Sequence, residues 1–180
     1  MKREINVLEH ASEILTALSK GILVTTKAGE KVNTMSISWG TLGIEWGKPI
    51  FTLFVREHRY TREMLDQNPE FTINVPVGEY EKKVIGYCGT YSGRNTDKIQ
   101  DMNLTLEEPL EITVPGLKEF PLTLECKVLY RQLQDKNLIP QEIREKDYPQ
   151  DVDSTAPLAN KDFHVAYYGE IVKAYIIENE

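Results

Sequence analysis

The stretch "GILVTTKAGEKVNTMSISWG", residues 21–40, predicts a β-hairpin with two unlike faces. A tight turn at "KAGEK", which contains Gly29, joins its two strands. Along the second strand, short hydroxyl side chains alternate with bulky apolar ones: Thr34, Ser36 and Ser38 against Met35, Ile37 and Trp39. Because successive side chains of a strand point to opposite faces, one face is a row of hydroxyls and the other suits a core. The short hydroxyls leave room for another group to lie against the strand.

The composition is that of a folded globular protein. Of the 180 residues, 41% are hydrophobic and 27% are charged, which is compatible with a single domain over residues 1–180. The formal net charge of -7 argues against nucleic-acid or anionic-membrane partners. There is no apolar run of the ~20 residues that cross a bilayer, and no apolar core of a signal peptide. We therefore expect a cytoplasmic protein in which Cys88 and Cys126, which match no metal or redox spacing, are reduced and buried.

Short strands account for most of the remaining pattern. We expect strands at 50–55, at 71–77 and at 163–178 (one or two strands around Gly169), and an antiparallel pair formed by "LEITVPG" (110–116) and "LTLECKVLYRQL" (122–133). The stretch "TLGIEWGKP" (41–49) is expected to be a loop, and helices are expected at 8–18, at about 61–67 and within 78–93. Six or seven strands with only short helices between them predict a mainly β fold, a closed or nearly closed β-barrel of Greek-key type. The spacing does not suit regular βαβ units.

Residues 134–162 interrupt this pattern. They are rich in charge and proline and poor in apolar side chains, so we expect a long surface excursion. Excursions of this length in compact domains are usually functional or mobile. The segment contains no motif that indicates a particular ligand.

A basic cluster stands out in this acidic chain. The segment "VREHRYTREM" (55–64) holds Arg56, His58, Arg59 and Arg62 around Tyr60 and Thr61. Thr61 is a reasonable N-cap, so that the helix start would present free N–H groups to an anion, and arginine forks suit phosphate oxygens. These features predict a site for one small phosphate group. The alternative is that the arginines pair with neighbouring carboxylates on a solvated surface.

Two further stretches carry polar side chains of interest. In "CGTYSGRNTDKI" (88–99), Gly89, Ser92 and Gly93 form a donor-rich connection, and Arg94 and Lys98 add positive charge. The chain has no P-loop and no GxGxxG motif. His164 lies in a predicted strand without a second histidine or cysteine at metal-ligand spacing, so a structural role is the alternative to a chemical one, and no metal site is expected.

Taken in order, these stretches resemble the flavin reductase-like family, the FMN-binding split β-barrel proteins that include flavoredoxin. The matching segments are "NTMSISWG" (33–40), "PIFTLFVREHRYTREML" (49–65) with "FTINVP" (71–76), "CGTYSGRNTDKI" (88–99) and "FHVAYYGEIV" (163–172). The resemblance covers roughly residues 21–173. It implies a homodimer with one non-covalently bound FMN per subunit near the interface, and NAD(P)H as a possible co-substrate.

The resemblance also assigns roles to residues. It implies that the strand Thr34–Trp39 lies along the flavin ring, and that the segment with Arg56, Arg59, Tyr60 and Thr61 receives the phosphate. Ser92 and Lys98 look like a family serine and lysine near the cofactor, and His164 matches a histidine on the substrate side of the flavin. Trp39 is a point of conflict, because its parity places it in the core whereas the resemblance places it near the cofactor.

Three functions are compatible with these features. The first is an FMN-dependent NAD(P)H oxidoreductase that passes electrons to free flavin or another small acceptor. The second is a flavoredoxin-like FMN carrier that exchanges electrons with redox-protein partners and has no nicotinamide activity of its own. The third is a non-redox barrel that binds a small ligand. Because the cofactor carries the redox chemistry, no acid–base pair is required in the sequence.

Overall fold

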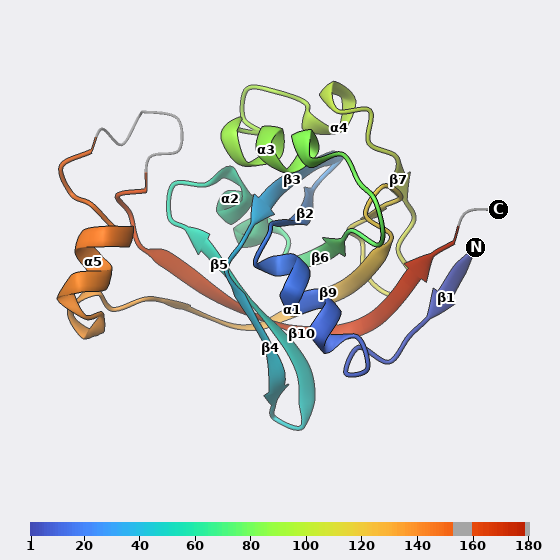
Figure 1. Ribbon diagram of the computed structural model, residues 1–180, viewed down its shortest axis with the longest axis horizontal. Coiled ribbons are helices and arrows are strands. Elements are labelled where there is room, and N and C mark those ends of the chain that lie inside the picture. The colour runs from blue at the N-terminus through green and yellow to red at the C-terminus, as the bar shows by residue number, and fades with distance from the viewer. Residues whose placement is uncertain (153–159, 179–180) are drawn as a thin grey trace.

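The computed structural model describes residues 1–152 and 160–178, and its main feature is an eight-stranded antiparallel sheet (Figure 1). The strands follow one another in space in the order β3-β2-β6-β9-β10-β5-β4, and β1 pairs with β10. Their bounds are β1 Lys2–Glu4, β2 Ile22–Ala28, β3 Lys31–Ile37, β4 Gly40–Glu45, β5 Lys48–Arg56, β6 Glu70–Val75, β9 Leu122–Leu133 and β10 His164–Ile177. Two short strands, β7 (Leu106–Glu107) and β8 (Gly116–Leu117), form a separate pair. The mainly β, split-barrel fold predicted from the sequence is confirmed.

Short helices surround the sheet. They are α1 Ala11–Leu18, α2 Tyr60–Gln67, α3 Lys82–Thr90, α4 Lys98–Asp101 and α5 Gln141–Asp147, together with one 3₁₀ turn, Lys136–Leu138. In Figure 1, α2, α3 and α4 lie alongside β2 and β3, whereas α5 stands apart beside the start of β10. Among the described residues, none of the helices has both the length and the apolar character that a membrane crossing would require.

The hairpin at residues 21–40 forms as predicted. β2 and β3 pair in a continuous register from Ile22–Ile37 to Ala28–Lys31, and Gly29 has a positive φ of 58° in the turn. Met35 and Ile37 point into the main hydrophobic core, as their parity predicts. Trp39 lies beyond the end of β3 and is 42% exposed. The alternation of the strand therefore does not extend to Trp39, and its side chain is not in the core.

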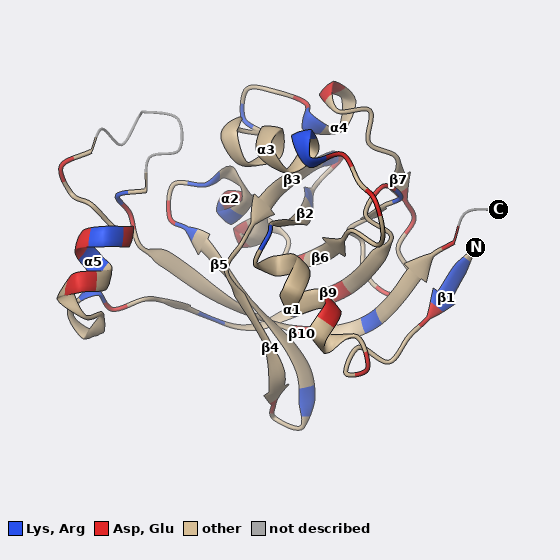
Figure 2. Cartoon of the chain, in the orientation of Figure 1, with Lys and Arg blue, Asp and Glu red and all other residues tan. Residues whose placement is uncertain are grey.

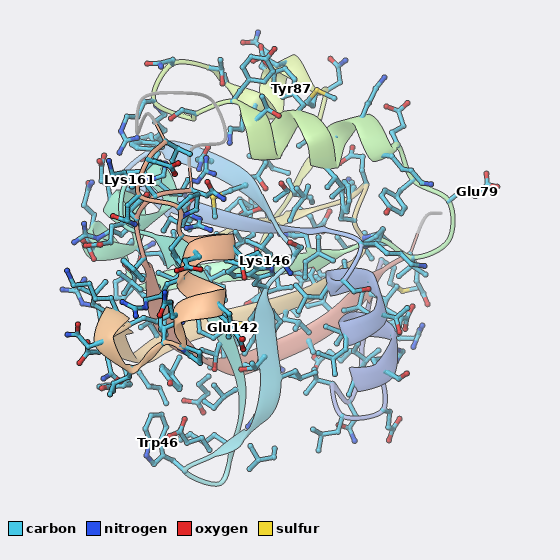
Figure 3. The ribbon with its side chains drawn as sticks, turned by 60° about the vertical axis from the view of Figure 1, so that its left-hand side comes forward. Trp46, Glu79, Tyr87, Glu142, Lys146 and Lys161 are labelled. Atoms are coloured by element: carbon cyan, nitrogen blue, oxygen red, sulfur yellow. The ribbon has the colours of Figure 1, made fainter. Side chains whose placement is uncertain are left out.

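The prediction of a loop at residues 41–49 is wrong. β4 and β5 form a second hairpin, whose two turn residues, Trp46 and Gly47, both have positive φ (53° and 70°). Such turns match the twist of paired strands but usually carry Asn-Gly or Asp-Gly, and tryptophan hides the signal. Figure 3 shows Trp46 at the far tip of this hairpin, which projects from the body of the molecule.

The helix predictions hold in position, with two corrections of detail. α1 buries Ile14 and Leu18, whereas Leu15 is 43% exposed and Leu8 precedes the helix. α2 ends at Gln67 as predicted, but Thr61 does not cap it: Arg59 occupies the N-cap position, and Thr61 is buried in the first turn. Thr61 is buried because its hydroxyl accepts a hydrogen bond from Asn33 Nδ2 (3.3 Å) beneath the helix.

The predicted pairing of residues 110–116 with β9 is also wrong, since β9 pairs with β6 and β10. Residues 110–115 form a loop held by the buried carboxylate of Glu125, and Gly116 begins β8, which pairs with β7. This carboxylate accepts hydrogen bonds from the backbone N–H groups of Leu110 (2.6 Å), Glu111 (2.8 Å) and Ile112 (3.3 Å). With its N–H groups satisfied in this way, the loop needs no strand partner.

β10 is a single strand of 14 residues with a register irregularity at Tyr168 and Gly169. A side chain at Gly169 would begin within 2.5 Å of the Phe71 ring, so glycine lets the strand pass the core closely. Cys88 and Cys126 are buried free thiols, as predicted. The excursion at 134–162 contains the 3₁₀ turn and α5, while its residues 153–159 lie outside the described part of the chain.

Candidate functional site

A cavity of about 290 Å³ lies where β3 and β5 end and β10 begins. It is lined by side chains from these strands, from the segment after β5 and from α3: Met35, Ser36, Ile37, Ser38, Trp39, Phe54, Arg56, Arg59, Gly89 and His164. Residues predicted from three separate stretches of the sequence therefore meet at one place. The volume is close to the lower end of the range for small-molecule pockets (~300–1,000 Å³).

The hydroxyl face of β3 supplies one wall. Ser36 and Ser38 line the cavity, whereas Thr34 is buried and donates its hydroxyl to Val24 O on the neighbouring strand (3.1 Å). A side chain at Gly89 would begin 2.4 Å from Ser36 Oγ, so α3 can approach this wall only through a glycine. The result is a shallow slot along the end of β3, as the short side chains predict.

Arg59 gives the cavity an available positive charge. Its guanidinium lines the cavity, and no described residue forms a hydrogen bond or ion pair with it. Asp162 is the nearby carboxylate that favours the charged form, but it is bound by His58, through the backbone N–H (2.7 Å) and the ring Nδ1 (2.5 Å). Burial lowers the pKa of Arg59. Because the ordinary pKa of arginine is very high, the side chain still keeps its charge at neutral pH. Within residues 1–152 and 160–178, no group occupies the donors of this guanidinium, which suits it to meet an anion.

Arg56 is engaged differently. Its Nη1 donates to the carbonyl oxygens of Asn160 (2.8 Å) and Asp162 (2.7 Å), and its Nη2 donates to that of Asp147 (2.9 Å). It therefore fastens both described ends of the excursion to the barrel. Burial, and then the positive charge of Arg59, lower its pKa. Figure 2 shows the basic residues where β5 ends and the chain leads into α2.

The other predicted basic residue, Lys98, lies behind the cavity rather than in its wall. The side chain is buried and donates from Nζ to Thr34 O (2.9 Å) and Cys88 O (2.8 Å). Burial lowers its pKa to about 8, and the charge of Arg59 contributes in the same direction. Lys98 thus joins α4, α3 and β3 into one support beneath the slot.

Three more predicted residues do not line the cavity. Ser92 accepts a hydrogen bond from the backbone N–H of Arg94 (3.3 Å), and Thr61 is buried beneath α2. The Tyr60 ring lies between Lys31 Nζ (4.7 Å) and the guanidinium carbon of Arg94 (5.5 Å). Contacts of these three residues with a cofactor remain predictions.

His164 and Trp39 supply an aromatic part of the cavity wall. Their ring centres are 5.1 Å apart, and His164 is only 6% exposed. Burial lowers the pKa of His164 to about 4, and the charges of Arg56 and Arg59 act in the same direction. The imidazole is therefore neutral at pH 7.

Sequence reasoning missed Phe54 and Tyr148, and it read Gly89 only as part of a loop. Phe54 lies in the predicted strand at 50–55, and it also lines the cavity, with its ring 6.4 Å from that of His164. Tyr148 belongs to the excursion, yet it is buried, and its hydroxyl lies 2.8 Å from His164 Nδ1. A lone aromatic residue in a polar segment was the available signal.

The fold and site together define a split β-barrel with a slot that is cationic on one side and aromatic on another. A family model described as "Flavin reductase like domain" matches residues 18–180. The chain therefore belongs to the flavin reductase-like family.

Individual proteins are similar to this chain in sequence or in structure. An uncharacterized protein of Archaeoglobus fulgidus is 30% identical over 125 residues, which are 69% of this chain and 66% of that protein. The chain thus spans slightly less than two thirds of that relative's length. Flavoredoxin from Methanosarcina acetivorans is similar in structure, with a TM-score of 0.61, 25% identity, and 88% of this chain and 68% of that chain covered. A split-barrel-domain protein from Shewanella frigidimarina gives a TM-score of 0.65 at 19% identity, over 97% of this chain and 76% of that one, which supports the fold alone.

Proposed function

We propose that this protein binds FMN non-covalently in the cavity and acts as an FMN-dependent NAD(P)H oxidoreductase. The observation that carries the proposal is Arg59, a cation facing the cavity without a partner among the described residues, beside a slot lined by short hydroxyls. A flat ring with a phosphate group needs both features. Family membership supports the same class of cofactor.

The donor set fits the chemical groups of FMN. The phosphate carries nearly two negative charges at neutral pH, and a planar guanidinium with free N–H groups suits it. Ser36 and Ser38 offer hydroxyls to the polar edge of the ring, while Trp39 and Phe54 offer apolar contact. When bound, the flavin supplies the capacity to accept and release hydride or electrons, and the protein contributes binding, orientation and access.

Further parts of the proposal rest on the family resemblance. Thr34, Tyr60, Thr61, Ser92 and Lys98 would support the cofactor from behind or from the phosphate side, and His164 would face the substrate. We also propose a homodimer with FMN near the interface. Exposed apolar side chains are available to bury there, among them Leu8, Ile44, Trp46 and Leu129.

The test is the visible spectrum of the purified protein with and without added FMN, followed by assays with NADH and NADPH. The proposal predicts a bound flavin spectrum and faster oxidation of one reduced nicotinamide when flavin is supplied. A flavin-loaded sample that oxidises neither nicotinamide would rule out the reductase.

A second candidate is an FMN electron carrier without nicotinamide activity. The 25% identity to a flavoredoxin favours it. Reduction of the bound flavin by a redox protein, with no response to NADH or NADPH, would select this function. A protein that stays colourless after exposure to FMN would instead favour a barrel for a non-redox ligand.

A further inference from the structure

We propose that Tyr148 is a positioning residue that fixes the tautomer of His164, so that the protonated Nδ1 faces Tyr148 and the lone pair of Nε2 faces the cavity. His164 then accepts a hydrogen bond from whatever occupies the cavity beside it. The identity of that occupant rests on the proposed function, whereas the tautomer does not.

The argument starts with the two contacts of the Tyr148 hydroxyl. Its oxygen lies 2.8 Å from His164 Nδ1 and 3.1 Å from Gln134 Oε1. A phenol has one proton to donate, and an amide oxygen can only accept. The Tyr148 proton therefore goes to Gln134, and His164 Nδ1 must donate its own proton to the phenol oxygen.

The second step concerns the charge of His164. Burial, with Arg56 and Arg59 acting in the same direction, lowers the pKa of His164 to about 4, against a smaller opposing effect of Asp162. The neutral imidazole carries a single proton. With that proton on Nδ1, Nε2 is a hydrogen-bond acceptor.

Tyr148 is held firmly enough to impose this arrangement. Its ring stacks on Phe163 with centres 4.6 Å apart and planes 12° apart, and the Arg56 guanidinium carbon lies 4.9 Å from its centre. Arg56 also binds the carbonyl of Asp147, the preceding residue (2.9 Å). The backbone of Gln134 is held beside His164 as well, because its N–H donates to the carbonyl of His164 (3.0 Å).

With Nδ1 engaged by Tyr148, Nε2 is the nitrogen left for an occupant of the cavity. His164 lines the cavity, and no described residue forms a hydrogen bond with Nε2. An acceptor at this point favours an occupant that presents an N–H or O–H group and disfavours one that presents a carbonyl oxygen. Gln134 and Tyr148 thereby contribute to ligand selection through His164, although neither of them lines the cavity.

The test is the ¹⁵N NMR spectrum of the imidazole nitrogens in flavin-free, full-length protein at pH 7, with the signals of the three histidines separated by a His164→Gln variant. The wild type should show a protonated Nδ1 and a lone-pair Nε2 for His164. Tyr148→Phe keeps the ring and removes the hydroxyl, so the Nε2–H tautomer that predominates in water should take over. Gln134→Leu should also shift His164 to the Nε2–H tautomer, because the Tyr148 hydroxyl is then free to donate to Nδ1. Gln134→Glu keeps an acceptor for that hydroxyl and should keep the wild-type tautomer.

Tyr130→Phe is the matched control, because it removes a hydroxyl that contacts Gln132 on β9 (3.1 Å) and should leave His164 unchanged. A lone-pair Nδ1 in the wild type, or the same tautomer in the wild type, Tyr148→Phe and Gln134→Leu, would overturn the proposal. If Tyr148→Phe fails to fold, Gln134→Leu still decides the question. Because the spectra need no flavin, failure of the protein to bind FMN would refute the proposed function and leave this result intact.

Discussion

Replacement of Arg59 by alanine tests whether this residue belongs to a phosphate-binding site or only to a basic surface. The Arg59 guanidinium lines the cavity without a hydrogen-bond partner among the described residues, so its removal leaves no described group unsatisfied. We therefore expect the free energy of unfolding of Arg59→Ala to stay within about 0.5 kcal/mol of the wild type. A charge-assisted hydrogen bond to phosphate contributes about 1.5–3 kcal/mol, which corresponds to a roughly 10- to 150-fold rise in the FMN dissociation constant.

The assay is a titration of flavin fluorescence with FMN and, in parallel, with riboflavin, which has the same ring but no phosphate. Arg59→Ala should weaken FMN binding and leave riboflavin binding nearly unchanged. Arg62→Ala is the matched control, since it also removes one positive charge. Arg62 lies in α2, pairs with Asp66 (3.6 Å) and does not line the cavity. Unchanged FMN affinity, or an equal loss for both flavins, would refute a phosphate contact at Arg59.

Three further predictions follow from the same site. Ser38→Leu should fill the slot and abolish FMN uptake while the thermal unfolding midpoint stays near that of the wild type; normal flavin content would contradict a ring lying against β3. Arg56→Ala breaks three hydrogen bonds to the excursion and should lower the free energy of unfolding in urea by about 2–4 kcal/mol, which is less than the sum for three fully buried bonds because the side chain is only part-buried. Amide exchange in α5 should become faster. The folded pKa of His164, about 4, is below its ordinary 6.5, so the folded state binds fewer protons between these values and loses stability as the pH falls. That loss is at most about 3.4 kcal/mol, and urea titrations should show a shallower pH dependence for His164→Gln; identical slopes would contradict the lowered pKa.

Much of the fold could be predicted because its signals are local. The hairpin at residues 21–40 combines a period of two with a glycine turn, and both are visible in a short window. β4 was missed because its turn uses Trp46 rather than the usual asparagine or aspartate. Residues 110–115 resemble a strand in their alternation, and the distant Glu125 carboxylate, which accepts hydrogen bonds from their N–H groups, explains why they form none.

Part of the candidate site could also be predicted, because several of its residues have recognisable chemistry within a single segment. The hydroxyl strand, Arg59 and His164 carry recognisable chemistry within their own segments, and the structure brings them together. Tyr148 could not be found in this way, because its role depends on contacts with His164 and Arg56. Both residues lie outside the excursion that contains Tyr148. The engagement of Arg56 by backbone carbonyls is likewise invisible to a sequence pattern.

The central claim, that this cavity holds FMN, is tested most directly by the visible absorption spectrum during a titration of flavin-free protein with FMN. A bound cofactor predicts a flavin spectrum distinct from that of free FMN, saturating at one FMN per chain. A spectrum that remains the simple sum of free FMN and colourless protein at every ratio would contradict it.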